Sequence, residues 1–255
     1  MSDASFLVPD GPAPANVRAF STTRLGGVSA GPYASLNLGD HVGDDPRAVA
    51  ENRRRVGQWL PTAPAWLRQV HGVAVVDAAR AAVGCEADAA CTRQADAVCV
   101  VMTADCLPVL FCDRAGTVVA AAHAGWRGLA GGVLEATVAA MGVPAGELLA
   151  WLGPAIGPAA FEVGGEVRDA FLALDPAAES AFAPRPEGKW LADIFLLARQ
   201  RLARLGLTAV YGGGVCTVSD AGRFFSHRRD RVTGRMASLV WLAGEGAGNH
   251  PSAGA

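Results

Sequence analysis

Residues 101–128 read VMTADCLPVLFCDRAGTVVAAAHAGWRG, and this stretch determines how the rest of the chain is interpreted. Apolar runs at 95–102, 108–112 and 117–122 have the length of strands, and residues 113–116 form a turn between the last two. A helix is expected at 128–141, beyond a glycine-containing break. Strands that follow one another through short turns, with helices set apart, predict an α+β fold rather than a regular alternation of strand and helix.

The same patterns extend outward on both sides of this central stretch. Further strands are expected at 17–22, 66–76, 210–218 and 237–242. Further helices are expected at 45–60, 165–174 and 194–205. Within the second of these strands, His71 and Gly72 interrupt the apolar pattern. We expect one domain at 17–242, between a flexible N-terminal segment at 1–16 and a flexible tail at 243–255 that contains His250.

The composition is that of a globular protein with a large core. Of the 255 residues, 51% are hydrophobic and 18% are charged, and the formal net charge is −2. A chain so close to neutral gives no basic surface for nucleic acid or for an anionic membrane as its main partner. With neither a signal peptide nor an apolar run long enough to span a bilayer, we expect a cytoplasmic protein. We also expect it to be a monomer or weak homodimer.

The six cysteines are expected to be free thiols. No two of them form a CxxC pair, and a chain of this length does not depend on disulfides for its stability. Cys99 and Cys112 lie within apolar runs, where cysteine acts as a small hydrophobic residue. We expect one of the six, Cys106, to carry chemistry and the others to be dispensable for function; these are Cys85, Cys91, Cys99, Cys112 and Cys216.

Three metal-capable residues lie beside glycines or at strand ends. His71 stands in RQVHG, Cys106 in TADCLP and His123 in AAHAGWRG. A polar residue followed by glycine is costly in a buried strand unless the backbone there must present a side chain. Two imidazoles and one thiolate suit zinc or copper, and three protein ligands leave a position open for catalysis. Their wide spacing also fits two ordinary histidines and a buried cysteine.

Three arginines are candidate contacts for an anionic group. Arg24 and Arg127 lie in glycine-flanked loops, TTRLGG and GWRG, and Arg53 lies in the expected helix at 45–60. The planar guanidinium can hold phosphate or carboxylate through two hydrogen bonds. The sequence is equally consistent with solvated charges at these positions.

Several blocks of the chain resemble the YfiH family from Val17 to Leu242. These blocks are STTRLGGVSAGPYASLNLGDHVGDDP, WLRQVHG, VMTADCLPVLFCDRAGTVVAAAHAGWRG, WLGPAIGPAAFEVGGEV and FFSHRRDRVTGRMASLVWL. The resemblance implies a four-layer α/β/β/α sandwich related to the catalytic domain of cytotoxic necrotizing factors. It further implies a site with zinc as the cofactor, or possibly copper, held by His71, Cys106 and His123, which are then catalytic together with a substrate-facing Arg53. From the matching motifs we extend substrate contact to Arg24, Asn37 and Arg127.

Members of this family are called laccase-like polyphenol oxidases, purine nucleoside phosphorylases or peptidoglycan editing factors. Multicopper oxidation needs several histidine-rich copper sites, whereas this chain has five histidines in all. We therefore favour a zinc-dependent purine nucleoside enzyme. It is expected to catalyse phosphorolysis of adenosine, inosine or methylthioadenosine, and deamination of adenosine. Its partners are then a nucleoside and phosphate.

An amide hydrolase is the alternative that the family resemblance raises. It removes L-serine from the cell-wall precursor UDP-MurNAc-L-Ser, a nucleotide-linked substrate. Cys106 could attack the amide with His123 as its base, or a metal could supply the nucleophile. The two versions conflict, because a thiolate that binds zinc is a poor free nucleophile. The sequence does not choose between them. A non-enzymatic metal scaffold is disfavoured, because a three-ligand site leaves a position open.

Overall fold

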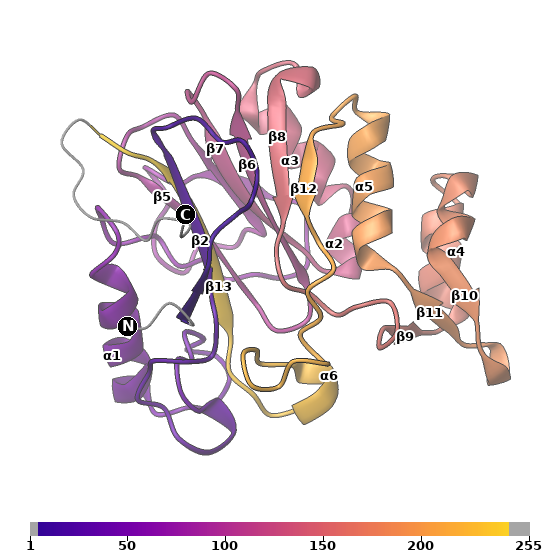
Figure 1. Cartoon of the computed structure of the whole chain (residues 1–255), viewed down its shortest axis with the longest axis horizontal. Coiled ribbons are helices and arrows are strands. Elements are labelled where there is room, and N and C mark those ends of the chain that lie inside the picture. The colour runs from indigo at the N-terminus through magenta and orange to yellow at the C-terminus, as the bar shows by residue number, and fades with distance from the viewer. Residues whose placement is uncertain (1–4, 245–255) are drawn as a thin grey trace.

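The computed structural model describes residues 5–244 and has a mixed α+β fold built around two stacked β-sheets (Figure 1). The four-stranded sheet has the order β1-β2-β13-β5. Its strands are β1 (Phe6–Leu7), β2 (Val17–Thr22), β13 (Met236–Leu242) and β5 (Val98–Thr103). The six-stranded sheet has the order β12-β8-β6-β7-β4-β3. Its strands are β12 (Val210–Gly212), β8 (Leu148–Leu152), β6 (Leu107–Asp113), β7 (Val119–Ala124), β4 (Ala89–Thr92) and β3 (Val75–Asp77).

The antiparallel hairpin of β6 and β7 forms the centre of the six-stranded sheet. Pro108 pairs with His123 in its register. β8 lies antiparallel on the other side of β6, whereas β12 and β3 are added in parallel to β8 and β4. Alternate residues of β6 point to opposite faces, as the strand period requires. Leu110 and Cys112 face the other sheet, while Val109 and Phe111 face the helices.

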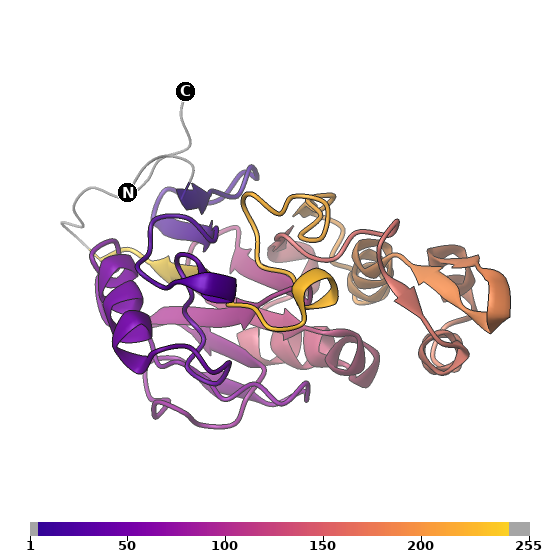
Figure 2. The ribbon, with the colours of Figure 1, turned by 90° about the horizontal axis from the view of Figure 1, so that it is seen from below.

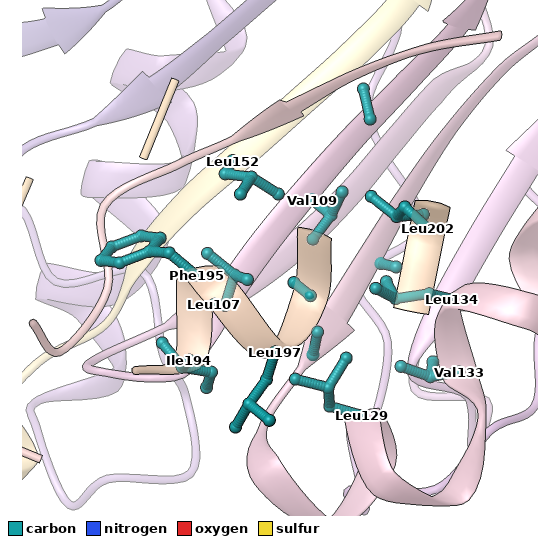
Figure 3. Close-up of a cluster of buried hydrophobic side chains, with 14 of the residues drawn as sticks. Leu107, Val109, Leu129, Val133, Leu134, Leu152, Ile194, Phe195, Leu197 and Leu202 are labelled. Carbon is teal, nitrogen blue, oxygen red and sulfur yellow. The ribbon is translucent and has the colours of Figure 1, made fainter. Parts of the chain in front are cut away.

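Helices cover the outer faces of both sheets. On the six-stranded sheet these are α2 (Trp126–Gly131), α3 (Val133–Met141) and α5 (Ile194–Arg204). Figure 3 shows Leu107, Val109 and Leu152 of the strands packed against leucines of these helices. The four-stranded sheet packs its outer face, including Phe20 and Trp241, against Val56 of α1 (Pro46–Gly57). Helix α1 begins at Pro46, directly after Asp45, whose side chain caps it by accepting a hydrogen bond from the amide of Arg47.

A small lobe projects from one end of the molecule (Figure 2). It contains α4 (Gly165–Leu172) and a three-stranded sheet with the order β10-β11-β9. Its strands are β9 (Glu162–Val163), β10 (Phe182–Pro184) and β11 (Trp190–Ala192). The short helix α6 (His227–Asp230) lies in the segment that leads to β13. Among residues 5–244, no helix is both long and apolar enough to cross a membrane.

Several predicted elements are confirmed and others are wrong. The strand at 17–22 and the helices near 45–60, 165–174 and 194–205 are present. The predicted strand at 66–76 is wrong, because only β3 at its end is a strand. The predicted helix at 128–141 is two helices, interrupted at Gly132, whose φ is 101°. The predicted strand at 210–218 stops after Gly212, where a run of three glycines with positive φ begins.

The predicted division into segments stays a prediction. Residues 1–4 and 245–255, which include His250, lie outside the described residues. Within the segment predicted to be flexible, Phe6 pairs with Thr22 in the four-stranded sheet. The Phe6 ring also lies 4.7 Å from the ring of Phe20, centroid to centroid.

Candidate metal centre

His71, Cys106 and His123 meet at one end of the sheet pair. One ligand atom from each lies within 4.8 Å of the other two. The Cys106 Sγ atom is 3.7 Å from Nε2 of His71, and the two imidazole rings are 4.8 Å apart between centroids. His123 is buried, Cys106 is half-buried and His71 is exposed, so the centre lies at the base of an opening to solvent.

The β6–β7 hairpin explains why Cys106 and His123 are neighbours. Cys106 precedes β6 by one residue and His123 lies near the end of β7. Leu107 pairs with Ala124 and Pro108 pairs with His123, so strand pairing brings the thiol to the imidazole. His71 has no such sheet position, and it reaches the centre from an irregular loop with a φ of 60°.

Asp88 holds this loop and one of the rings in place. Its fully buried carboxylate accepts hydrogen bonds from the backbone amides of Val70, His71 and Gly72. It also lies 2.8 Å from Nδ1 of His123. With Nδ1 donating to the carboxylate, Nε2 is the His123 nitrogen left for a metal or for the Cys106 thiol. The four contacts explain why residues 70–72 do not form a strand.

Asp105 fixes the turn that carries Cys106. Its φ is 91°, and its buried carboxylate accepts hydrogen bonds from Thr217, Ser226 and the amide of Arg228. The carboxylate therefore joins the β5–β6 turn to two segments more than a hundred residues away. These bonds stabilise a backbone conformation that is unfavourable for a residue with a side chain.

Two glycines of the HAGWRG motif allow the backbone to approach the centre closely. A Cβ atom on Gly125 would lie 2.7 Å from Cδ2 of His71 and 3.0 Å from Sγ of Cys106. A Cβ atom on Gly128 would lie 2.9 Å from the carbonyl oxygen of Gly72. The start of α2 thus packs directly against two of the three side chains, and only glycine leaves room there.

The thiol and the His123 imidazole shift each other's pKa values. Burial opposes ionisation of Cys106, but the charge of His123 and hydrogen bonds from both histidines outweigh it and lower the thiol pKa to about 6. Burial also disfavours protonation of His123, but the thiolate and Asp88 outweigh it and raise the imidazole pKa to about 9. The pair is therefore most stable as thiolate and imidazolium, and a cationic metal can replace the proton.

The donor set fits a transition metal. A thiolate and two imidazoles suit zinc or copper, and the Asp88 carboxylate supplies the outer hydrogen bond that orients a histidine ligand. Three protein ligands leave one position open toward solvent, which is typical of a catalytic and not of a structural zinc site. His71, Cys106 and His123 are the residues that would hold the ion.

A cleft of about 340 Å³ opens from the centre, a volume that suits a small molecule. None of its described lining residues is a carboxylate; the lining comprises His41, Gln69, His71, Met102, Thr103, Ala104, Cys106, His123, Arg127, His227 and Arg235. Arg127 stacks on Trp126, and within residues 5–244 its guanidinium makes no hydrogen bond or ion pair. Arg235 donates to two backbone carbonyl oxygens through Nη1 alone. Both arginines therefore have free donors for an anion.

Of the four residues that the sequence predicts to contact substrate, Arg127 lines this cleft, and Arg24 and Asn37 do not. Arg24 donates to the carbonyl oxygens of Ala34 and Ala221 and lies over the Phe225 ring. Asn37 is fully buried, and both its amide nitrogen and its oxygen are hydrogen-bonded. Substrate contact by these two residues stays a prediction.

Arg53 also lies outside the cleft lining. Its Nε atom donates to the carbonyl oxygen of Leu38, its Nη2 atom is 3.2 Å from Asp40, and its guanidinium lies over Trp66. These contacts hold the loop that carries His41, which does line the cleft. The substrate-facing and catalytic roles of Arg53 stay predictions.

Sequence reasoning missed several residues of the site, including His41 and His227 of the cleft lining. Asp88 and Asp105 position the centre, and Gln69 and Arg235 line the cleft. A signal was present for the two aspartates, because each carboxylate stands beside a long apolar run where burial requires partners. No signal identifies Arg235 among the many arginines of the final segment.

Comparison with known proteins finds matches over nearly the whole chain. Residues 18–243 match the family model described as multi-copper polyphenol oxidoreductase laccase. The chain is 64% identical over 239 residues to a purine nucleoside phosphorylase of Pseudomonas aeruginosa, covering 93% of this chain and 98% of that protein. It is 55% identical over 242 residues to the Escherichia coli purine nucleoside phosphorylase YfiH, and the match covers 94% of this chain and 99% of that protein.

Solved structures share the fold. A Neisseria meningitidis protein of the DUF152 family superposes with a TM-score of 0.91 at 59% identity, and the match covers 94% of this chain and 100% of that one. YlmD from Geobacillus stearothermophilus superposes with a TM-score of 0.88 at 32% identity, and the match covers 96% of this chain and 98% of that one.

Proposed function

The chain belongs to the YfiH family, and we propose that it is a purine nucleoside phosphorylase acting at the centre of His71, Cys106 and His123. The names of its relatives support the reaction class. The observation that carries the proposal is the cleft beside the centre, whose lining has two arginines with free donors and no carboxylate among the described residues. Such a lining favours phosphate, the second substrate of phosphorolysis.

The chemistry assigns tasks to the residues of the cleft. In phosphorolysis the bond between ribose C1′ and purine N9 breaks, a bond from C1′ to a phosphate oxygen forms, and the departing purine takes up a proton. Arg127 and Arg235 hold the phosphate and neutralise its charge. His41 and His227 also line the cleft, and imidazole can transfer a proton near neutral pH. Asp88 keeps His71 and His123 in position.

We also propose that the resident metal is zinc, with copper as the alternative. When bound, zinc supplies a Lewis acid, which is the chemistry that deamination of adenosine at C6 requires. We therefore include adenosine deamination beside phosphorolysis of adenosine, inosine and methylthioadenosine. The residues that would hold the ion are His71, Cys106 and His123.

Elemental analysis tests the metal. We expect about one zinc per chain in the purified protein. His71→Ala and Cys106→Ser should lose it, whereas Cys85→Ser should retain it, because Cys85 is not part of the centre. Full metal occupancy in His71→Ala would overturn the assignment.

One observation favours amide hydrolysis as a second candidate. Cys106, His123 and Asp88 form a continuous set of thiol, imidazole and carboxylate. This is the order of nucleophile, base and orienting group in cysteine hydrolases. Without a metal, the thiolate of Cys106 could attack the amide carbonyl carbon of UDP-MurNAc-L-Ser and form a thioester as the C–N bond breaks and His123 protonates the amine of the leaving L-serine. Water would then hydrolyse the thioester and regenerate the thiol.

A substrate panel on one preparation of measured metal content separates the candidates. Adenosine with phosphate should yield adenine and ribose 1-phosphate, and omission of phosphate should abolish adenine release. UDP-MurNAc-L-Ser should release L-serine if the amidase is correct. Turnover of the second substrate alone would replace the phosphorylase proposal with the amidase.

We propose that the stacked sheets and their outer helices form the four-layer α/β/β/α sandwich of the catalytic domain of cytotoxic necrotizing factors. We further propose a single domain at 17–242 in a cytoplasmic protein that is a monomer or weak homodimer. Neither nucleic acid nor a membrane is expected as a partner.

A further inference from the structure

A second cavity adjoins the centre, and we propose that it is the subsite for the purine base. This inference rests on the proposed function. The cavity, called here the base cavity, has a volume of about 130 Å³. It shares Ala104, Cys106 and His227 with the cleft. Its lining comprises Ala104, Asp105, Cys106, Trp126, Ile156, Phe161, Ile194, His227 and Arg228.

The walls of the base cavity suit a flat, weakly polar ring. They are formed mainly by Trp126, Ile156, Phe161 and Ile194, of which the last three are buried. A cavity of about 150 Å³ accommodates benzene. The base cavity is slightly smaller, about 130 Å³, so it takes part of a purine and the rest remains in the adjoining cleft. Aromatic side chains also stack favourably on nucleic-acid bases.

The two charged residues at the base cavity, Asp105 and Arg228, are held in place by hydrogen bonds to neutral groups. The carboxylate of Asp105 accepts three hydrogen bonds. Arg228 donates through its guanidinium to the carbonyl oxygens of Ala160 and Glu162. The base cavity thus has one cationic and one anionic side chain, whereas the cleft has two arginines and no carboxylate among its described lining residues.

The placement of the two spaces matches the geometry of phosphorolysis. The reacting C1′ atom lies between the base that departs and the phosphate that attacks. Cys106 lines both the base cavity and the cleft, so the centre lies where they join. With the purine in the base cavity, the ribose lies at the centre and the phosphate in the cleft beside Arg127 and Arg235.

His227 gives the shared rim one defined polar atom. Its Nδ1 lies 2.8 Å from the carbonyl oxygen of Arg231, which can only accept, so Nδ1 carries the proton. In the neutral ring Nε2 is then an acceptor. An acceptor there matches the amino group of adenine, which makes free adenine the suitable probe.

Calorimetric titration of adenine into the zinc-loaded protein tests the base cavity without any turnover. Ile156→Phe fills the cavity, and Phe161→Leu removes an aromatic wall while preserving an apolar side chain. Each should weaken adenine binding about tenfold or more. The matched control is Val83→Phe, which adds the same ring at a site 73% exposed and outside both spaces, and it should bind adenine as the wild type does. Thermal unfolding establishes that each variant is folded.

Binding that weakens in the two cavity variants but not in the control supports the assignment, as does a rise in the KM for adenosine with an unchanged KM for phosphate. Unchanged adenine affinity in either folded cavity variant, or no adenine binding to the wild type, overturns it. Adenine binding with the expected weakening, in a protein that shows no phosphorolysis, leaves the base cavity standing and refutes the proposed function instead.

Discussion

Arg53 holds the loop that carries His41 from a position outside the cleft lining. Its Nε and Nη2 atoms hold Leu38 and Asp40, and its plane lies over Trp66. Lysine retains the charge but cannot make these contacts together. We expect Arg53→Lys to lower kcat/KM for adenosine about tenfold to a hundredfold, equivalent to the loss of about 1–3 kcal/mol. Steady-state kinetics at measured zinc content provides the test.

The neighbouring arginines provide the control for this substitution. Arg54 and Arg55 both pair with Glu51 on the outer side of α1. Arg54→Lys and Arg55→Lys should therefore leave kcat/KM unchanged, and zinc content should be unchanged in all three variants. Equal kinetic effects at positions 53, 54 and 55 would show that the contacts of Arg53 do not influence the reaction.

Gly125 is the residue where the backbone itself shapes the centre. A methyl group at this position would contact Cδ2 of His71 at 2.7 Å and Sγ of Cys106 at 3.0 Å. Gly125→Ala must therefore displace two candidate ligands, and we expect zinc affinity to fall at least tenfold in competition with a chelator. Gly146→Ala is the control, because a Cβ atom there meets nothing within 4 Å. Equal zinc affinity in both variants would contradict this geometry.

At the scale of elements, the β6–β7 hairpin depends on the turn that joins its strands. Asp113 is 4% exposed, and its carboxylate accepts hydrogen bonds from the amides of Thr117 and Val118 and from the Thr117 hydroxyl. Burial opposes ionisation, but these bonds outweigh it and lower the pKa of Asp113. The charged carboxylate thus stabilises the hairpin that brings Cys106 next to His123.

Replacement of Asp113 tests this turn through its pH dependence. Asp113→Asn should reduce the free energy of unfolding by about 1–3 kcal/mol at pH 7. Because the folded pKa is depressed, the stabilisation is complete above the ordinary pKa of about 4 and is lost as pH falls through the folded value. The difference from wild type in urea unfolding should therefore shrink below pH 4. Glu187→Gln, at an exposed side chain, should show no such difference at any pH. A gap for Asp113→Asn that stays constant from pH 7 to pH 3 would contradict this account.

The elements divide into those that local sequence determines and those that it does not. Helix α1 could be predicted because Asp45 caps it and Pro46 occupies its first position. The loop at 68–74 could not, because its apolar residues resemble a strand. Its conformation depends on Asp88, whose contact with the amide of His71 spans 17 positions in the sequence. Similarly, the interruption at Gly132 depends on a left-handed conformation that a helical pattern conceals.

For the whole molecule, the order of strands is the part that the sequence could not supply. Strand β13 lies between β2 and β5, and β12 joins the far edge of the other sheet, although nothing local indicates these pairings. The three residues of the candidate metal centre could be named in advance, since the family resemblance points to the same three residues that the structure brings together. The cleft was not, because His41, Arg127 and Arg235 come from segments that only the complete fold unites.

The layer between the two sheets joins these distant segments into one cooperative unit. Leu110 of β6 is 3% exposed in this layer, which also contains Val101 of β5 and Val240 of β13. Leu110→Ala leaves a cavity that neighbouring strands cannot fill without disturbing their pairing, so we expect the free energy of unfolding to fall by about 2–5 kcal/mol. The dependence of that free energy on urea should be unchanged, because both proteins expose similar surface on unfolding.

Leu174→Ala makes the same chemical change at a side chain that is 46% exposed, and it should cost much less. Leu110 does not line the cleft or the base cavity, so kcat/KM for adenosine should stay within about twofold of wild type at temperatures where both proteins are folded. Equal stability of the two leucine variants would mean that the sheets are held together elsewhere. A large loss of activity in folded Leu110→Ala would mean that the layer between the sheets also sets the geometry of His71, Cys106 and His123.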